Sequence, residues 1–142
     1  MKKLALIILL FSTHIFAQKS KVEGFCSSSA KSLALSKSMI YDNKENVYHK
    51  EESGRLTDLI IAAKNGKVQN YMKEYHYLDE DKKQKALQIF LDDSFEKDED
   101  YIDEDSLDAE KWVSNTKKIF VTYTPFESYN LRITVFCLNN QL

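Results

Sequence analysis

The sequence has 142 residues, with 20 Lys and Arg against 22 Asp and Glu and a formal net charge of −2. A chain of this length has room for one domain with a buried core. The near-neutral charge argues against general nucleic-acid binding, which needs a basic face that displaces counterions from phosphates. We therefore expect no nucleic-acid partner.

The first residues have the pattern of a cleavable secretory signal peptide. Two lysines precede an apolar run from Leu4 to Phe11, and the small residue Ala17 offers a cleavage point. The run is well short of the roughly 20 residues that a helix needs to span a bilayer, so we expect cleavage rather than a membrane anchor. We predict a signal peptide over 1–17, a single mature domain over 18–142, a periplasmic or secreted location and no stable membrane insertion after cleavage.

Two cysteines, Cys26 and Cys137, lie near the two ends of the predicted mature chain. Thiols tend to pair in an oxidising compartment, so we predict a disulfide between them. A reactive thiol or a metal ligand is the alternative, but a zinc site needs more Cys or His ligands than this chain offers.

Turn-forming residues are scarce, with three glycines and one proline in the sequence. This scarcity argues against an all-β sandwich, which needs frequent turns. We therefore predict a mainly α fold: a compact domain of about four helices with a C-terminal β-hairpin (α+β), its two ends tied by the disulfide.

The first helix is expected over 27–39, where Ala30, Leu33 and Ala34 recur at helical spacing. The polar stretch 42–52 that follows is expected to be a loop.

The next two helices are expected on either side of a tight turn at Asn65-Gly66, a pair suited to a helix C-terminus. The apolar residues before the turn have helical spacing: Leu56, Leu59, Ile60 and Ala63. Those after the turn fall on one helical stripe: Val68, Tyr71, Met72, Tyr75 and Leu78.

The run 56–68 resembles the helix–turn–helix of an ankyrin repeat, whose pattern has Thr, an Ala pair and Gly at these intervals, as in Thr57, Ala62, Ala63 and Gly66. The resemblance covers about one repeat, and no second copy lies at the family's spacing. Because a lone repeat cannot bury its own face, we interpret the run as a generic helical hairpin.

Asp79 is expected to cap a fourth helix. The apolar face of that helix would consist of Ala86, Leu87, Phe90, Leu91 and Phe95. Further on, the apolar residues of 109–123 also match a helical period, but Ile119–Tyr123 is rich in β-branched and aromatic residues. We favour a helix through about Lys117 and a strand after it, with one long helix as the alternative.

The final run alternates between apolar and polar residues, as expected for a half-buried strand. One face would consist of Leu131, Ile133, Val135 and Cys137. We predict a C-terminal hairpin with its turn around Pro125–Asn130.

The segment 92–110 contains 11 of the 22 acidic residues and a single base, Lys97. A patch of this kind can steer a basic partner, and we predict that another protein with a basic surface binds there. The predicted partner-binding residues are Asp98, Glu99, Asp100, Tyr101, Asp103, Glu104 and Asp105. Exposed tyrosines are expected to contribute as well, at Tyr101, Tyr123 and Tyr129.

Calcium binding and a merely solvated acidic loop are the alternatives for this segment. With Asp98 as position 1 of an EF-hand loop, Asp103 stands where glycine is needed and Ala109 where a glutamate belongs. We therefore predict no metal site.

Catalytic motifs are not found: the chain has no serine elbow, glycine-rich phosphate loop or zinc-protease helix. His76 lies beside the predicted buried stripe, which favours a surface or hydrogen-bonded structural histidine over a general base or ligand. We predict no catalytic residues, no cofactor and a non-enzymatic protein of the bacterial envelope, either immunity- or inhibitor-like or regulatory. A small periplasmic hydrolase or metal-binding protein that uses the carboxylates and His76 is the alternative.

Overall fold

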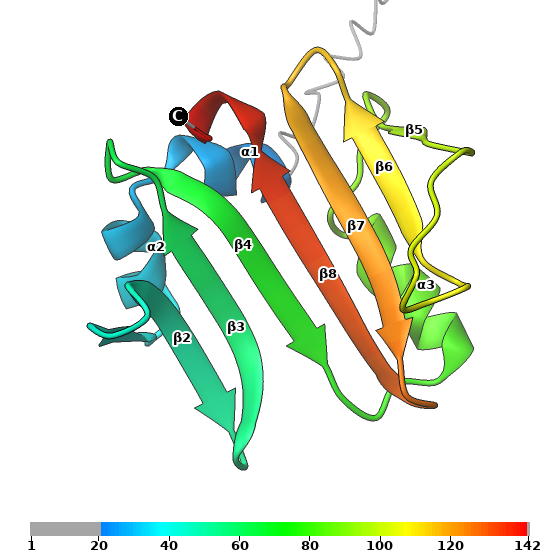
Figure 1. The fold of residues 1–142 in the computed structure, drawn as a ribbon, viewed down its shortest axis with the longest axis horizontal. Coiled ribbons are helices and arrows are strands. Elements are labelled where there is room, and N and C mark those ends of the chain that lie inside the picture. Colours follow the sequence, from blue (N-terminus) through cyan, green and yellow to red (C-terminus); the bar gives the residue numbers. More distant parts are fainter. Residues whose placement is uncertain (1–20, 142) are drawn as a thin grey trace, which may run out of the picture.

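The computed structural model describes residues 21–141, and the predicted signal peptide lies outside them. Within these residues, eight strands form one antiparallel sheet, and three short α-helices lie on one side of it (Figure 1). We call the side of the sheet that the helices pack against the covered face and the opposite side the open face.

The helices are α1 (Lys21–Ser27), α2 (Ala30–Ser36) and α3 (Glu80–Gln88), and a short 3-10 turn, η1 (Leu138–Asn140), follows the last strand. The strands are β1 (Ile40–Asp42), β2 (Val47–Glu52), β3 (Arg55–Ala62), β4 (Val68–Tyr75), β5 (Glu96–Lys97), β6 (Glu110–Ser114), β7 (Ile119–Phe126) and β8 (Asn130–Cys137). Their order across the sheet is β1-β2-β3-β4-β8-β7-β6-β5. The chain therefore builds two four-stranded meanders, separated by α3, which join where β4 pairs with β8.

The predicted mainly α fold is wrong, and the largest error falls on 56–78. The two helices expected there are the strands β3 and β4, so the ankyrin-like run is a β-hairpin with Gly66 in its turn at a φ of 79°. The error has a physical cause, because β3 carries apolar side chains on both faces. Leu59 and Ile61 lie on one face and Ile60 on the other, which hides the strand period of two behind an apparent helical spacing.

The scarcity of glycine and proline also misled the fold prediction. Several turns of this sheet use other residues in the left-handed backbone conformation. In the turns between paired strands these residues are Asn46, Ser53, Lys118 and Glu127, and Ser38 and Tyr77 adopt the same conformation in the connections to α2 and α3. A low glycine count therefore does not exclude a meandering sheet here.

Other boundaries also differ from the predictions. The expected loop at 42–52 is largely β2, and the helix expected up to Lys117 is the strand β6. The expected helix over 27–39 is the shorter α2, preceded by a separate α1. The helix after Asp79 ends at Gln88.

Three local predictions are confirmed. The Asp79 side chain caps α3 by accepting a hydrogen bond from the Lys82 amide. The C-terminal hairpin is formed by β7 and β8. The alternating residues of β8 predicted to share a face are all buried: Leu131, Ile133, Val135 and Cys137.

The core lies between the covered face and the helices. From the sheet it takes Ile60, Tyr71, Val121, Ile133 and Val135, and from the helices Val22, Phe25, Ala30, Ala34, Ala86 and Leu87. The predicted disulfide is present: Cys26 of α1 is bonded to Cys137 at the end of β8. It fastens α1 to a central strand across 111 positions of sequence.

Candidate functional site

The acidic segment forms the border of the sheet beside β6 (Figure 1). We call residues 98–109, which link β5 to β6, the acidic loop. Asp98 attaches the loop to β6, because its amide donates to the Lys111 carbonyl at 2.8 Å and its carboxylate lies 3.2 Å from the Lys111 ammonium. Ser106 attaches the other end by donating to the Pro125 carbonyl at 2.9 Å. The loop is therefore held at both ends.

The structure brings all seven predicted partner-binding residues into this loop, but not all of them face solvent. Glu99, Asp100, Glu104 and Asp105 are exposed, whereas Asp98, Tyr101 and Asp103 are half-buried. Tyr101 donates to the Asp103 carboxylate at 3.2 Å, and burial, together with that neighbouring carboxylate, raises the pKa of Tyr101. These half-buried residues shape the loop, and its exposed carboxylates, which also include Asp108, carry its outward charge.

Sequence reasoning missed two apolar residues in the same loop. Ile102 is 84% exposed and Leu107 is 100% exposed. Every other exposed residue of the loop is an aspartate or a glutamate. The available signal was clearest at Ile102, an apolar residue within a run of acids that has no apolar neighbour at strand or helix spacing. The prediction weighed the charge of the segment and its tyrosine, but not its aliphatic residues.

Within residues 21–141, no group of three or more His, Cys, Asp and Glu side chains is placed to hold a metal ion. Two of the loop aspartates are engaged with the loop backbone instead. Asp98 accepts from the Asp100 amide at 3.3 Å, and Asp103 accepts from the Asp105 amide at 2.9 Å. These carboxylates stabilise turns in the loop.

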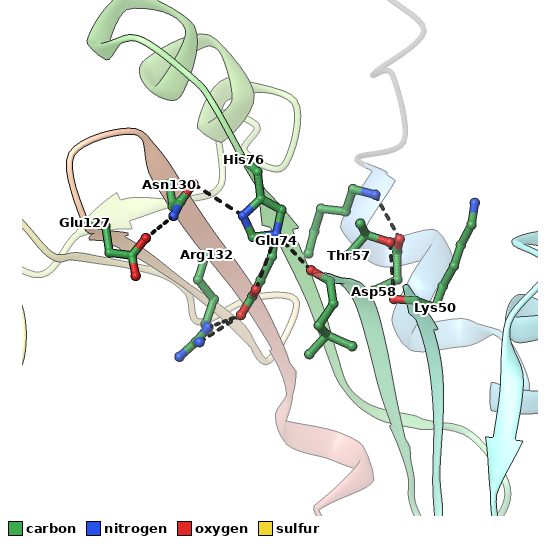
Figure 2. A network of polar contacts seen from close by, with 10 residues as sticks. Lys50, Thr57, Asp58, Glu74, His76, Glu127, Asn130 and Arg132 are labelled. Atoms are coloured by element: carbon green, nitrogen blue, oxygen red, sulfur yellow. Dashed lines mark hydrogen bonds and ion pairs between the residues drawn. The ribbon is translucent and has the colours of Figure 1, made fainter. Parts of the chain in front are cut away.

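A second group of polar side chains lies at the end of the sheet where β3 begins and β4 ends (Figure 2). Asp58 is buried on the covered face, where it accepts from the Tyr71 hydroxyl at 2.6 Å and from the Lys73 ammonium at 2.9 Å. Burial alone would raise the pKa of Asp58, but the hydrogen bonds from Tyr71 and Lys73 outweigh it and hold that pKa below its ordinary value. Asp58 is therefore a buried, paired carboxylate.

His76 bridges three strands at this end of the sheet, beyond the last paired residues of β3 and β4. One ring nitrogen lies 3.0 Å from the Leu56 carbonyl and the other 3.3 Å from the Asn130 side-chain oxygen (Figure 2). The Asn130 amide nitrogen donates to Glu127 at 2.7 Å, which places the Asn130 oxygen toward His76. Because both partners are acceptors, a neutral His76 ring donates to one of them at a time, and with either bond it joins β4 to a neighbouring strand, which is a structural role.

A cleft of about 370 Å³ opens beside His76. Its carboxylates are held in ion pairs: Glu74 receives two hydrogen bonds from Arg132, at 2.7 and 2.9 Å, and Glu52 lies 3.1 Å from Lys50. Glu74 also lies 3.7 Å from the nearer ring nitrogen of His76. Both carboxylates of the cleft are therefore in contact with basic side chains.

The three candidate tyrosines have different positions. Tyr129 is exposed in the turn between β7 and β8, and Tyr101 is half-buried in the acidic loop. The prediction that Tyr123 is exposed is wrong, because it lies on the covered face of β7 together with Val121 and is 2% exposed.

Comparisons with protein-family models, curated proteins and solved structures find no match for this chain. Among residues 21–141, no helix is long and apolar enough to cross a membrane.

Proposed function

We propose that this protein is a non-enzymatic, exported binding protein whose acidic loop contacts another protein with a basic surface. The observation that supports the proposal is the exposure of Ile102 and Leu107 among carboxylates. Burying one such side chain contributes about 1.5 to 3 kcal/mol. Protein interfaces typically combine a few apolar anchors with a polar rim, and the loop has this composition.

The charge of the loop suits a partner of opposite sign. Four exposed carboxylates lie within seven positions, at Glu99, Asp100, Glu104 and Asp105. Complementary charge accelerates encounter and disfavours acidic partners. The biological role would be to neutralise a toxin or hydrolase in the periplasm, as immunity and inhibitor proteins do, or to regulate an envelope protein.

Export is part of this proposal. The leader-like pattern before Ala17 supports it, and the disulfide between Cys26 and Cys137 is compatible with an oxidising compartment.

The test is affinity capture of a partner from envelope extracts, followed by binding of the identified, purified partner at two salt concentrations. One variant carries three neutral replacements in the acidic loop: Glu99→Gln, Glu104→Gln and Asp105→Asn. A matched control carries the same replacements at exposed acids elsewhere: Glu45→Gln, Glu51→Gln and Asp81→Asn. A third variant, Ile102→Ser with Leu107→Ser, removes the apolar anchors.

We expect the wild-type protein to lose affinity at high salt, because salt screens exposed charges. The loop variant should bind more weakly and depend less on salt, and the serine variant should also bind more weakly. The control should bind as the wild type does, and all melting temperatures should agree within about 1 °C. Undiminished binding by both loop variants would contradict the proposal.

A further inference from the structure

The open face of the sheet has apolar side chains at its centre, together with threonines and an asparagine. Strand pairing places one row of side chains across it: Leu59, Met72, Thr134 and Thr122. The next row consists of Ile61, Asn70, Phe136, Phe120 and Val113. Because successive residues of a strand point to opposite faces, these rows lie opposite the core residues Ile60, Tyr71, Val135 and Val121.

An antiparallel sheet covered on one side usually presents polar side chains on the other. Here the rings of Phe120 and Phe136 stack on the open face, with centroids 4.2 Å apart and planes 14° from parallel. Both are half-buried, as are Leu59 and Met72. These partly exposed apolar side chains, with Asn70 and two threonines between them, form a mixed patch that a partner can cover.

This patch is continuous with the acidic loop. Lys111 lies on the open face at the border of the sheet, with its ammonium 5.4 Å from the centre of the Phe120 ring. The same ammonium lies 5.8 Å from the centre of the Tyr101 ring and 3.2 Å from the Asp98 carboxylate, both in the loop. A partner seated on the loop therefore reaches the phenylalanine pair across Lys111.

We infer that the open face is the second part of the partner-binding surface, and that the partner presents an apolar ridge flanked by lysine or arginine. This inference rests on the proposed function. The ridge would cover Phe120 and Phe136, and the basic flank would face the exposed carboxylates of the loop. The charge argument favours a basic protein segment over a nucleic acid or an acidic protein.

The test uses random displayed peptides of about 16 residues, selected on the immobilised, oxidised protein, with the enriched sequences then synthesised. The variant Thr134→Arg places a bulky cation at the centre of the open face. Its control, Gln88→Arg, adds the same charge on the exposed side of α3, beyond the covered face. Thr122→Arg, on the neighbouring strand of the same face, serves if Thr134→Arg unfolds.

We expect the enriched peptides to combine apolar residues with Lys or Arg. Their dissociation constants should rise about tenfold or more with Thr134→Arg and stay unchanged with Gln88→Arg. Amide NMR signals of Thr134 and Phe120 should shift on titration with a peptide.

The acidic-loop variant with Glu99→Gln, Glu104→Gln and Asp105→Asn separates this inference from the proposed function. Peptides that lose affinity for the loop variant but bind folded Thr134→Arg normally would overturn the inference and leave the proposed function standing. If neither change weakens binding, both are wrong.

Discussion

Ile133 and Thr134 are neighbours on β8, yet they lie in different environments. Ile133 is fully buried between the sheet and the helices, whereas Thr134 is half-buried on the open face. The same contrast holds for Val135 and Phe136, the next two residues of the strand. Packing is therefore concentrated on one face of this sheet, and the other face can present side chains to a partner. Substitutions on the covered face should therefore affect stability, and substitutions on the open face should affect binding.

The largest effect is expected from the disulfide that fastens α1 to the covered face. The variant Cys26→Ala with Cys137→Ala should lose about 4 to 5 kcal/mol of unfolding free energy, because it no longer restricts a long loop of the unfolded chain. Urea denaturation of both proteins measures the difference. The wild-type protein, tested for free thiols without reductant, provides the control. Equal stability would mean that packing alone holds α1 in place.

The next prediction compares the two faces directly. Ile133→Ala should cost about 2 to 5 kcal/mol of unfolding free energy, because it leaves a cavity in the core. Thr134→Ala should cost less than about 1 kcal/mol, because only strand propensity and partial packing change. Denaturation curves of the two variants and the wild type measure both losses of unfolding free energy. Similar losses at both positions would show that the open face is as tightly packed as the covered face.

A smaller effect concerns the buried carboxylate on the covered face. The pKa of Asp58 is lowered in the folded protein, so ionised Asp58 stabilises the fold above the ordinary carboxyl pKa of about 4. This contribution is lost as the pH falls from there through the folded pKa. Asp58→Asn should therefore cost about 1 to 3 kcal/mol at pH 7 and flatten the decline of stability in acid.

The variant Asp100→Asn is the matched control for that measurement, because it makes the same substitution at an exposed position. Thermal unfolding between pH 7 and pH 3 follows both variants. An unchanged acid profile for Asp58→Asn would show that the hydrogen bonds from Tyr71 and Lys73 do not stabilise the charged form.

The smallest effect is expected from calcium at the acidic loop. A ligand that prefers the folded state raises the melting temperature, and millimolar calcium against a chelator tests for one. We expect a change of less than about 1 °C, because Asp98 and Asp103 are hydrogen-bonded to loop amides. A rise of several degrees would show a cation site and would shift the interpretation of the loop from partner binding to metal binding.

Short-range chemistry made part of this structure predictable. The cap at Asp79 depends on residues within one helical turn, and the β7–β8 hairpin depends on alternation within one strand. The pairing of Cys26 with Cys137 was also predictable, because the chain contains no other cysteine. The acidic segment was recognisable from its amino-acid composition. Export stays a prediction, because it depends on residues before those that the structure describes.

Tertiary structure alone decided the rest. Ile60 and Ile61 are equally apolar, so no local pattern tells which of them packs under the helices and which lies on the open face. Ile102 and Leu107 are exposed because no other element packs against their side chains, and their own chemistry would equally suit a core. Exposure is a property of neighbours distant in sequence, and strand pairing across the whole chain sets those neighbours.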